Sequence, residues 1–339
     1  MTEVQEIKKV LVVGAGGFVG GFLVEEALRR GWQVWAGVRS STSRAYLTDS
    51  RIRFVELDFE NPESLAESLR SAMPEGKWDY IVYNLGATKV RRYADFSRIN
   101  YDYLRYFTGA LAQSGLVPEK FLYMSSLSAM GTLKKGVEEY TEDIIPAPNT
   151  RYGVSKLKAE TWLATAGIPY IIFRPTGIYG PRDHDYYLEF KSLAKGFDFQ
   201  VGFRKQTLTF LYVEDLARAV CDALERSATD TVYILSEPRN YTQKQFRKIV
   251  KKELGRKFVL PVKLPLWMVR FVSFFAEKYG VAVGKPSTLN RDKCRILSQR
   301  NWSASTAKAA EGFGFSPRVF LQDGVERSIE WYRKEGWLK

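Results

Sequence analysis

The stretch VVGAGGFVG, residues 12–20, joins an apolar run to a segment with helical spacing. Glycines between a strand and a helix let the backbone approach the phosphates of a dinucleotide, and the helix N-terminus attracts those anions. The spacing is G-x-x-G-x-x-G, because the glycines that matter stand at 14, 17 and 20. We expect the first to make the tight turn, the second to admit the diphosphate and the third to allow close packing. The predicted cofactor-binding turn comprises Gly14, Gly17, Phe18, Val19 and Gly20.

Short β-branched runs alternate with helical patterns as far as Arg174, and beyond it the pattern loosens. Repeated strand–helix units predict a parallel sheet covered by helices on both faces. The fold class is therefore α/β, a doubly wound parallel sheet (Rossmann fold). We predict that residues 1–174 form the dinucleotide-binding domain, which carries the catalytic residues. Residues 175–339 are expected to form a smaller mixed substrate-binding lobe, with some chain returning to the first domain.

The 339 residues are 45% hydrophobic, which is enough to bury a sizeable core. Cys221 and Cys294 have no disulfide-like or zinc-like spacing, so we expect a cytoplasmic protein. The N-terminus lacks the pattern of a signal peptide. His184 is the only histidine, which excludes a histidine-based triad and a multi-histidine metal site.

A net charge of +13 calls for an anionic partner. The basic residues are scattered and no nucleic-acid-binding module accompanies them, so we do not expect nucleic acid. The apolar stretch 264–280 is interrupted by Arg270 and is too short to span a bilayer. Its aromatic residues fit three readings: plain core, a substrate-lining surface, or peripheral contact with an anionic membrane.

The end of the second predicted strand indicates which dinucleotide binds. An Asp or Glu there would hold the ribose hydroxyls of NAD, whereas this chain has Arg39 followed by SSTSR, which ends at Arg44. Cations and hydroxyls suit a 2′-phosphate, so NADP(H) is favoured and NAD(H) stays possible. Asp58, at the end of the third strand, is predicted to lie by the adenine.

Tyr152 and Lys156 stand one helical turn apart in RYGVSKLKAE, residues 151–160. A carbonyl that receives a hydride also needs a proton, which a tyrosine can supply if its pKa falls from about 10. A neighbouring ammonium favours the phenolate, so the pair fits acid–base chemistry. The spacing alone also occurs in helices where the two residues have no chemical role.

Further segments agree with this reading: MSSLSAMG (124–131), RPTGIYGP (174–181) and FLYVEDLARAV (210–220). Together with GAGGFVG and YGVSK, in this order, they resemble the extended short-chain dehydrogenase/reductase family over nearly the whole chain. The resemblance implies that Ser126 polarises the substrate carbonyl and that Tyr152 exchanges the proton. It implies that Lys156 activates the tyrosine and binds the ribose of the cofactor, and that Asn100 supports the site. Ser125 and Ser128 compete with Ser126 for the serine role.

Within this family, nucleotide-sugar enzymes typically carry an asparagine and an arginine that bind the substrate diphosphate. Gly177 and Leu208 stand at those positions, and the chain resembles the dihydroflavonol reductase and 3β-hydroxysteroid dehydrogenase branch more closely. We therefore predict an NADP(H)-dependent oxidoreductase that interconverts a hydroxyl and a carbonyl on an apolar lipid-, steroid- or flavonoid-like molecule. Thr176, Gly177 and His184 are the predicted substrate contacts.

Two alternatives stay open: a nucleotide-sugar epimerase or dehydratase with tightly bound NAD, and a cofactor-binding scaffold without turnover. The family resemblance also implies a homodimer.

Overall fold

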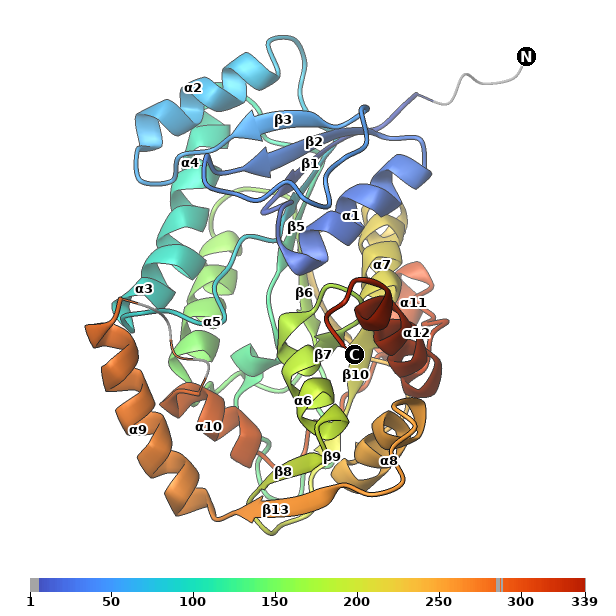
Figure 1. Cartoon of the computed structure of the whole chain (residues 1–339). Coiled ribbons are helices and arrows are strands. Elements are labelled where there is room, and N and C mark those ends of the chain that lie inside the picture. The colour runs from blue at the N-terminus through green and yellow to red at the C-terminus, as the bar shows by residue number, and fades with distance from the viewer. Residues whose placement is uncertain (1–5, 285–286, 288, 339) are drawn as a thin grey trace.

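Seven parallel strands form the central sheet of the computed structural model, which describes residues 6–284, 287 and 289–338 (Figure 1). From one edge to the other they are β11 (Thr231–Leu235), β6 (Tyr170–Pro175), β5 (Lys120–Met124), β4 (Tyr80–Tyr83), β1 (Lys9–Val13), β2 (Gln33–Val38) and β3 (Arg53–Glu56). The strand order reverses between β1 and β4, and in doubly wound sheets ligands bind at the carboxyl ends of the strands beside such a reversal. The predicted doubly wound α/β fold is confirmed.

Helices cover both faces of the sheet, so the strands are apolar on both sides. One face is covered by α1 (Phe18–Arg29), α7 (Val213–Arg226) and α11 (Ala307–Phe313). The other face is covered by α2 (Pro62–Ala72), α4 (Tyr103–Ser114) and α5 (Arg151–Leu163). The two groups lie on opposite sides of the sheet in Figure 1.

A continuous helical segment with a π-helical turn leads into α4. It begins as α3 (Ala94–Ser97), passes through a π-helical turn η1 (Arg98–Asp102) and continues as α4. A π-helical turn turns one side chain away from its regular helical position, and such turns concentrate at functional sites. Here it carries Asn100, which is fully buried.

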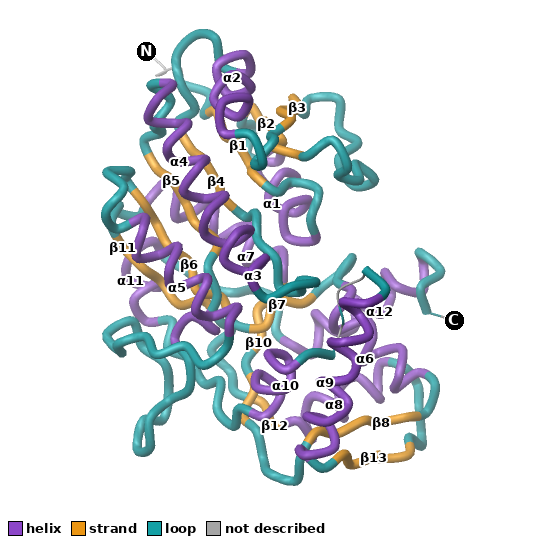
Figure 2. Tube along the Cα trace, turned by 90° about the vertical axis from the view of Figure 1, so that its left-hand side faces the viewer, coloured by secondary structure: helices purple, strands orange, loops and turns teal. Residues whose placement is uncertain are grey.

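The second half of the chain builds a lobe from short strand pairs and five helices. The pairs are β7 (Gly177–Tyr179) with β10 (Phe210–Tyr212), β8 (Phe197–Val201) with β13 (Leu260–Leu264), and β9 (Thr207–Leu208) with β12 (Tyr241–Thr242). The helices are α6 (His184–Ala194), α8 (Gln243–Glu253), α9 (Leu266–Ala282), α10 (Arg291–Ser298) and α12 (Leu321–Lys334). Figure 2 shows β8 and β13 at the far end of the molecule from β1–β3. The chain also returns to the sheet, because β11 belongs to this half.

Cys221 and Cys294 are both buried and free. Across the described residues, no helix is long and apolar enough to cross a membrane. The same residues contain no group of three or more His, Cys, Asp or Glu side chains suited to a metal ion.

Candidate active site

Ser126 and Tyr152 meet beyond the carboxyl end of β5. Ser126 caps the short 3₁₀ helix η2 (Leu127–Met130), and its hydroxyl accepts a hydrogen bond from the backbone N of Ser128 at 3.2 Å. Tyr152 lies in the first turn of α5, close enough to Ser126 for the serine hydroxyl to lower the pKa of the tyrosine. A carbonyl oxygen placed between these hydroxyls would meet two donors.

Ser125 has a different task from Ser126. Its hydroxyl donates to Glu160, which pairs in turn with Arg174 at 2.5 Å between Oε2 and Nη2. All three side chains are buried, so Ser125 belongs to an internal network rather than to an accessible site. The geometry therefore removes Ser125 from the choice, while Ser126 influences the pKa of Tyr152 directly.

A glycine allows the helix of Tyr152 to approach the serine turn. Thr150 caps α5 by accepting a hydrogen bond from the backbone N of Gly153 at 3.0 Å. A Cβ atom on Gly153 would lie only 2.2 Å from the carbonyl oxygen of Ser128. From the other side, Asp292 Oδ2 accepts a hydrogen bond from the backbone N of Tyr152 at 3.0 Å. These contacts fix Tyr152 against η2.

Burial governs the pKa values of the Tyr152–Lys156 pair. Lys156 is buried, and its Nζ donates to the carbonyl oxygen of Met124 at 2.8 Å. Burial lowers the pKa of Lys156 to about 8, although Glu160 acts in the opposite direction. Burial also raises the pKa of Tyr152 to about 12, against the lowering effect of Ser126. The expectation of a lowered tyrosine pKa is therefore wrong for the protein's own groups, and Tyr152 is held in its protonated, proton-donating form.

Asn100 supports the loop beside Lys156, as the family resemblance implied. Its Oδ1 accepts a hydrogen bond from the backbone N of Ala87 at 2.7 Å, and its Nδ2 donates to Ser155 Oγ at 2.9 Å. A Cβ atom on Gly86 would lie 2.9 Å from Lys156 Nζ. The loop after β4 and the catalytic helix are thus held in one arrangement.

The glycine turn has the geometry that a dinucleotide diphosphate needs. Gly14 has φ +83°, a left-handed conformation that glycine adopts without strain, and a Cβ on Gly20 would lie 2.2 Å from the Gly14 carbonyl oxygen. Gly17 is exposed and precedes α1, whose first turn, beginning with Phe18 and Val19, contains no acidic residue. These residues fit the predicted cofactor, because the free amides of the helix N-terminus face no competing carboxylate.

The loop after β2 covers this turn. A Cβ atom on Gly16 would lie 2.1 Å from Thr42 Cγ2, a contact that the spacing of the glycines did not reveal. Arg39 and Arg44 are exposed, and no carboxylate in the described part of the chain pairs with either. Asp58 is also exposed, and its Oδ1 accepts a hydrogen bond from the backbone N of Glu60 at 3.0 Å.

The three predicted substrate contacts differ in their surroundings. The Thr176 hydroxyl oxygen is buried with no hydrogen-bond partner in the described chain. At Gly177 an added Cβ would lie 2.3 Å from the hydroxyl of Tyr186. His184 begins α6 rather than lying in a loop, and its ring stacks on Trp337 at a centroid distance of 4.5 Å.

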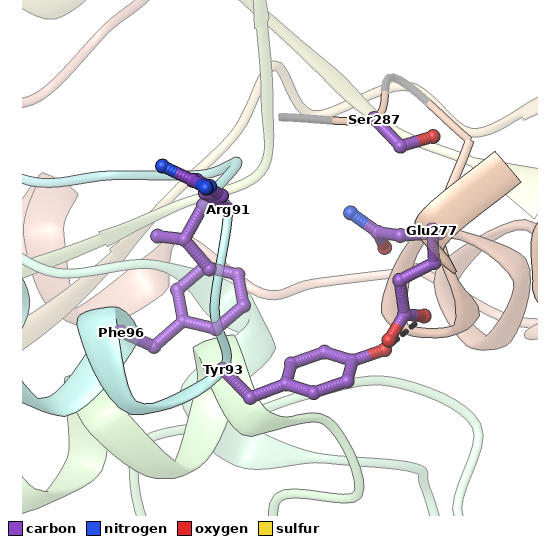
Figure 3. Close-up of a pocket in the computed structure, with 7 residues that line it drawn as sticks. Arg91, Tyr93, Phe96, Glu277 and Ser287 are labelled. Atoms are coloured by element: carbon purple, nitrogen blue, oxygen red, sulfur yellow. Dashed lines mark hydrogen bonds between the residues drawn. The ribbon is translucent and has the colours of Figure 1, made fainter. Parts of the chain in front are cut away.

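A small polar cluster connects helix α9 to the segment that contains Tyr93 and Phe96 (Figure 3). Tyr93 donates a hydrogen bond to Glu277 of α9, and Arg291 Nη2 lies 3.1 Å from Glu277 Oε1. A cavity of about 10 Å³ beside them is lined in part by Phe96. The Phe96 ring also lies 6.0 Å from the Tyr152 ring, so the anchor of α9 is one side chain away from the candidate catalytic tyrosine.

Comparison with known proteins identifies the family. The model of the NAD dependent epimerase/dehydratase family matches residues 10–235. The chain belongs to this family. It is an NAD(P)-dependent oxidoreductase of the extended short-chain dehydrogenase/reductase type, as the sequence motifs predicted.

Two curated relatives of the family match this chain almost from end to end. A ceramide reductase of Caulobacter vibrioides is 26% identical over 97% of this chain and 96% of its own length. A decarboxylating sterol-4-alpha-carboxylate 3-dehydrogenase of Dictyostelium discoideum is 21% identical over 94% of this chain and 99% of its own. Among solved structures, the UDP-glucose 4-epimerase of Thermotoga maritima has a TM-score of 0.78 at 23% identity, covering 96% of this chain and 99% of its own, which shows a shared fold.

The motifs did not reveal the positions that support the site by binding backbone atoms or by leaving room for neighbouring groups. Gly86 and Gly153 make room, and Asp292 holds the backbone N of Tyr152. The segment YGVSK contains Gly153, but only the approach of Ser128 in the folded chain shows why a side chain is excluded there.

Proposed function

We propose that this enzyme uses NADP(H) to interconvert a hydroxyl and a carbonyl on an apolar, lipid-like molecule. The observation that carries the chemistry is the meeting of Ser126 and Tyr152 beside buried Lys156. The substrate class is argued from the packing at Gly177, where the hydroxyl of Tyr186 occupies the space that a larger side chain would need.

In the reducing direction, Ser126 donates a hydrogen bond to the substrate carbonyl oxygen and polarises it. Bound NADPH supplies the hydride that the carbonyl carbon accepts. Tyr152 gives its phenolic proton to the oxygen, which completes the alcohol, and the ammonium of Lys156 stabilises the remaining phenolate. A pKa of about 12 suits Tyr152 for this direction, because the phenol is protonated at neutral pH.

The preference for NADP(H) rests on the charges after β2. Arg39 and Arg44 are exposed cations near the end of that strand. Thr42 lies between them, and its hydroxyl accepts a hydrogen bond from the backbone N of Arg39 at 3.0 Å. A ribose 2′-phosphate gains from this environment, whereas an unmodified 2′-hydroxyl gains little.

Two arguments favour an apolar substrate over a nucleotide sugar. A Cβ atom at position 177 would lie 2.3 Å from the Tyr186 hydroxyl, so the present packing suits glycine there and supports a substrate without a diphosphate held by an asparagine. The ceramide reductase and the sterol dehydrogenase, whose names describe lipid substrates, align with almost the whole chain. We infer that a long-chain or polycyclic ketone, or the corresponding alcohol, is the substrate.

The test is an NADPH-oxidation screen over long-chain ketones, keto-steroids, dihydroflavonols and keto-sugar nucleotides, with Tyr152→Phe as the control. The expected result is turnover of an apolar ketone by the wild type and loss of most turnover in Tyr152→Phe, with NADPH binding retained. Unchanged turnover in Tyr152→Phe would discard the mechanism. Release of stoichiometric NAD from the denatured protein, with turnover only of a nucleotide sugar, would replace the proposal with the epimerase or dehydratase alternative.

A further inference from the structure

Helix α9 turns one side into the protein and leaves the other side bare. Val269, Ser273 and Gly280 are buried at helical spacing, and they mark the inner side. The outer side carries four aromatic residues with the exposed fractions Trp267 70%, Phe271 60%, Phe274 37% and Phe275 53%. Of the three readings of these aromatic residues, the plain-core reading is therefore wrong for these four side chains.

The apolar surface continues at the foot of α9. Strand β13 leads directly into the helix and pairs with β8 (Figure 1). Exposed apolar side chains on or beside these strands are Phe199 56%, Phe203 71%, Phe258 74% and Leu260 48%. The surface of a soluble protein rarely contains so many large exposed apolar side chains, and such patches mark sites that bind a protein or a membrane.

A basic groove borders the same helix. A cavity of about 770 Å³ is lined by Lys134, Lys135, Arg270, Arg295 and Arg300, and no carboxylate is among its lining residues. Arg270 belongs to α9, so the groove and the aromatic side meet at this residue.

The exposed charges of α9 and of the strand that leads into it are positive. Between residues 256 and 284, all of which are described, the five Lys and Arg side chains are exposed, and the single acid, Glu277, is held by Tyr93 and Arg291.

We propose that the outer side of α9, the adjoining β8–β13 edge and the basic groove together dock this protein on an anionic lipid bilayer. Aromatic side chains enter the boundary between headgroups and acyl chains, and Lys and Arg side chains bind lipid phosphates. The helix rests on the bilayer rather than crossing it, since it is too short and too charged to span. A second copy of the chain is a poor occupant, because a two-fold contact would bring the same exposed cations against one another.

Docking through α9 would set the catalytic cleft at the membrane surface. The inner side of the helix is anchored by Tyr93 and Glu277, and Phe96 links this anchor to Tyr152. This consequence, entry of a lipid substrate beside α9, rests on the proposed function. The docking itself does not, because it requires neither cofactor nor substrate.

The test is co-sedimentation of the full chain with vesicles of phosphatidylcholine alone or with about a third of phosphatidylglycerol. We expect binding to the anionic vesicles that weakens with added salt, because exposed charges are screened. Trp267→Ala/Phe271→Ala/Phe275→Ala is expected to weaken this binding at least tenfold. Lys134→Glu/Lys135→Glu is expected to weaken it by at least a similar factor and to remove much of its salt dependence.

Matched controls carry the same kinds of change elsewhere. Ile7→Ala removes an exposed apolar side chain, and Arg70→Glu/Lys77→Glu reverses exposed charges at or just beyond α2, at the opposite end of the molecule from α9. Both should bind vesicles as the wild type does, and all variants should retain NADPH binding.

Failure of the wild type to bind anionic vesicles, or equal binding by the aromatic variant and its control, would overturn the proposal. So would a dimer in the analytical ultracentrifuge that the aromatic substitutions abolish. Turnover of a water-soluble ketone is measured separately, so loss of docking and loss of the proposed chemistry are distinguishable.

Discussion

Replacement of Gly153 by alanine tests whether the distance between α5 and the serine turn sets the rate. The added Cβ would lie 2.2 Å from the Ser128 carbonyl oxygen, whereas ordinary van der Waals contact begins at 3.4 Å. Helix and turn must therefore separate by about 1 Å. Tyr152 precedes Gly153 directly, and Ser126 lies two residues before Ser128, so the separation falls on the two hydroxyls that meet the carbonyl.

A displacement of about 1 Å at reacting groups costs on the order of 100-fold in rate. We therefore expect kcat of Gly153→Ala to fall about 100-fold with the best ketone of the screen. The glycine turn lies on other elements, so the dissociation constant for NADPH should stay within a few-fold. Overpacking should also lower the free energy of unfolding by about 1–3 kcal/mol.

Gly109→Ala is the matched control, because Gly109 lies on the exposed side of α4 and an added Cβ there has no atom within 4 Å. This variant should keep its kcat and gain about 0.5–1 kcal/mol of stability from the better helix former. A Gly153→Ala enzyme with wild-type kcat would refute the reasoning. If kcat fell equally in both variants, the cause would be the replacement of a helical glycine as such and not the contact with Ser128.

The buried charges and the cofactor loop give three more predictions. Glu160→Gln leaves Arg174 without its anionic partner in the core, so the free energy of unfolding in urea should fall by about 3 kcal/mol or more; a loss below 1 kcal/mol would contradict the pairing. Lys156 has a folded pKa of about 8, below its ordinary 10.5, so at this group the unfolded chain holds more protons between these values, and the contribution of Lys156 to stability should rise with pH across that window. Lys156→Met should abolish this rise, which is on the order of 3 kcal/mol, and an unchanged pH profile in urea titrations would disprove the lowered pKa. Arg39→Asp should weaken NADPH binding far more than NADH binding in fluorescence titrations, and an equal effect on both would remove the basis for the NADP(H) preference.

Local sequence patterns predicted the parts of the fold that depend on local chemistry. The glycine spacing, the strand–helix alternation and the residues at strand ends are readable because each constrains the backbone within a few positions. The π-helical turn at residues 98–102 was missed, since such a turn has no spacing signal, and only the folded chain shows that Asn100 within it bonds to Ser155. The pKa of Tyr152 was also misjudged, because burial by the surrounding fold raises it and outweighs the lowering effect of Ser126, while Lys156 Nζ donates to the carbonyl oxygen of Met124.

Local sequence patterns also did not predict which side of α9 is exposed. Its sequence contains apolar residues at nearly every position, so periodicity alone does not distinguish the buried side from a second apolar side. The fold decides, because Ser273 and Glu277 turn inward and make hydrogen bonds there, while larger aromatic residues are left outside. The exposed side of α9 therefore carries large aromatic residues together with the cations Arg270 and Lys278. Contact with water does not favour so many exposed aromatic side chains, whereas the boundary of an anionic bilayer suits both the aromatic and the cationic groups.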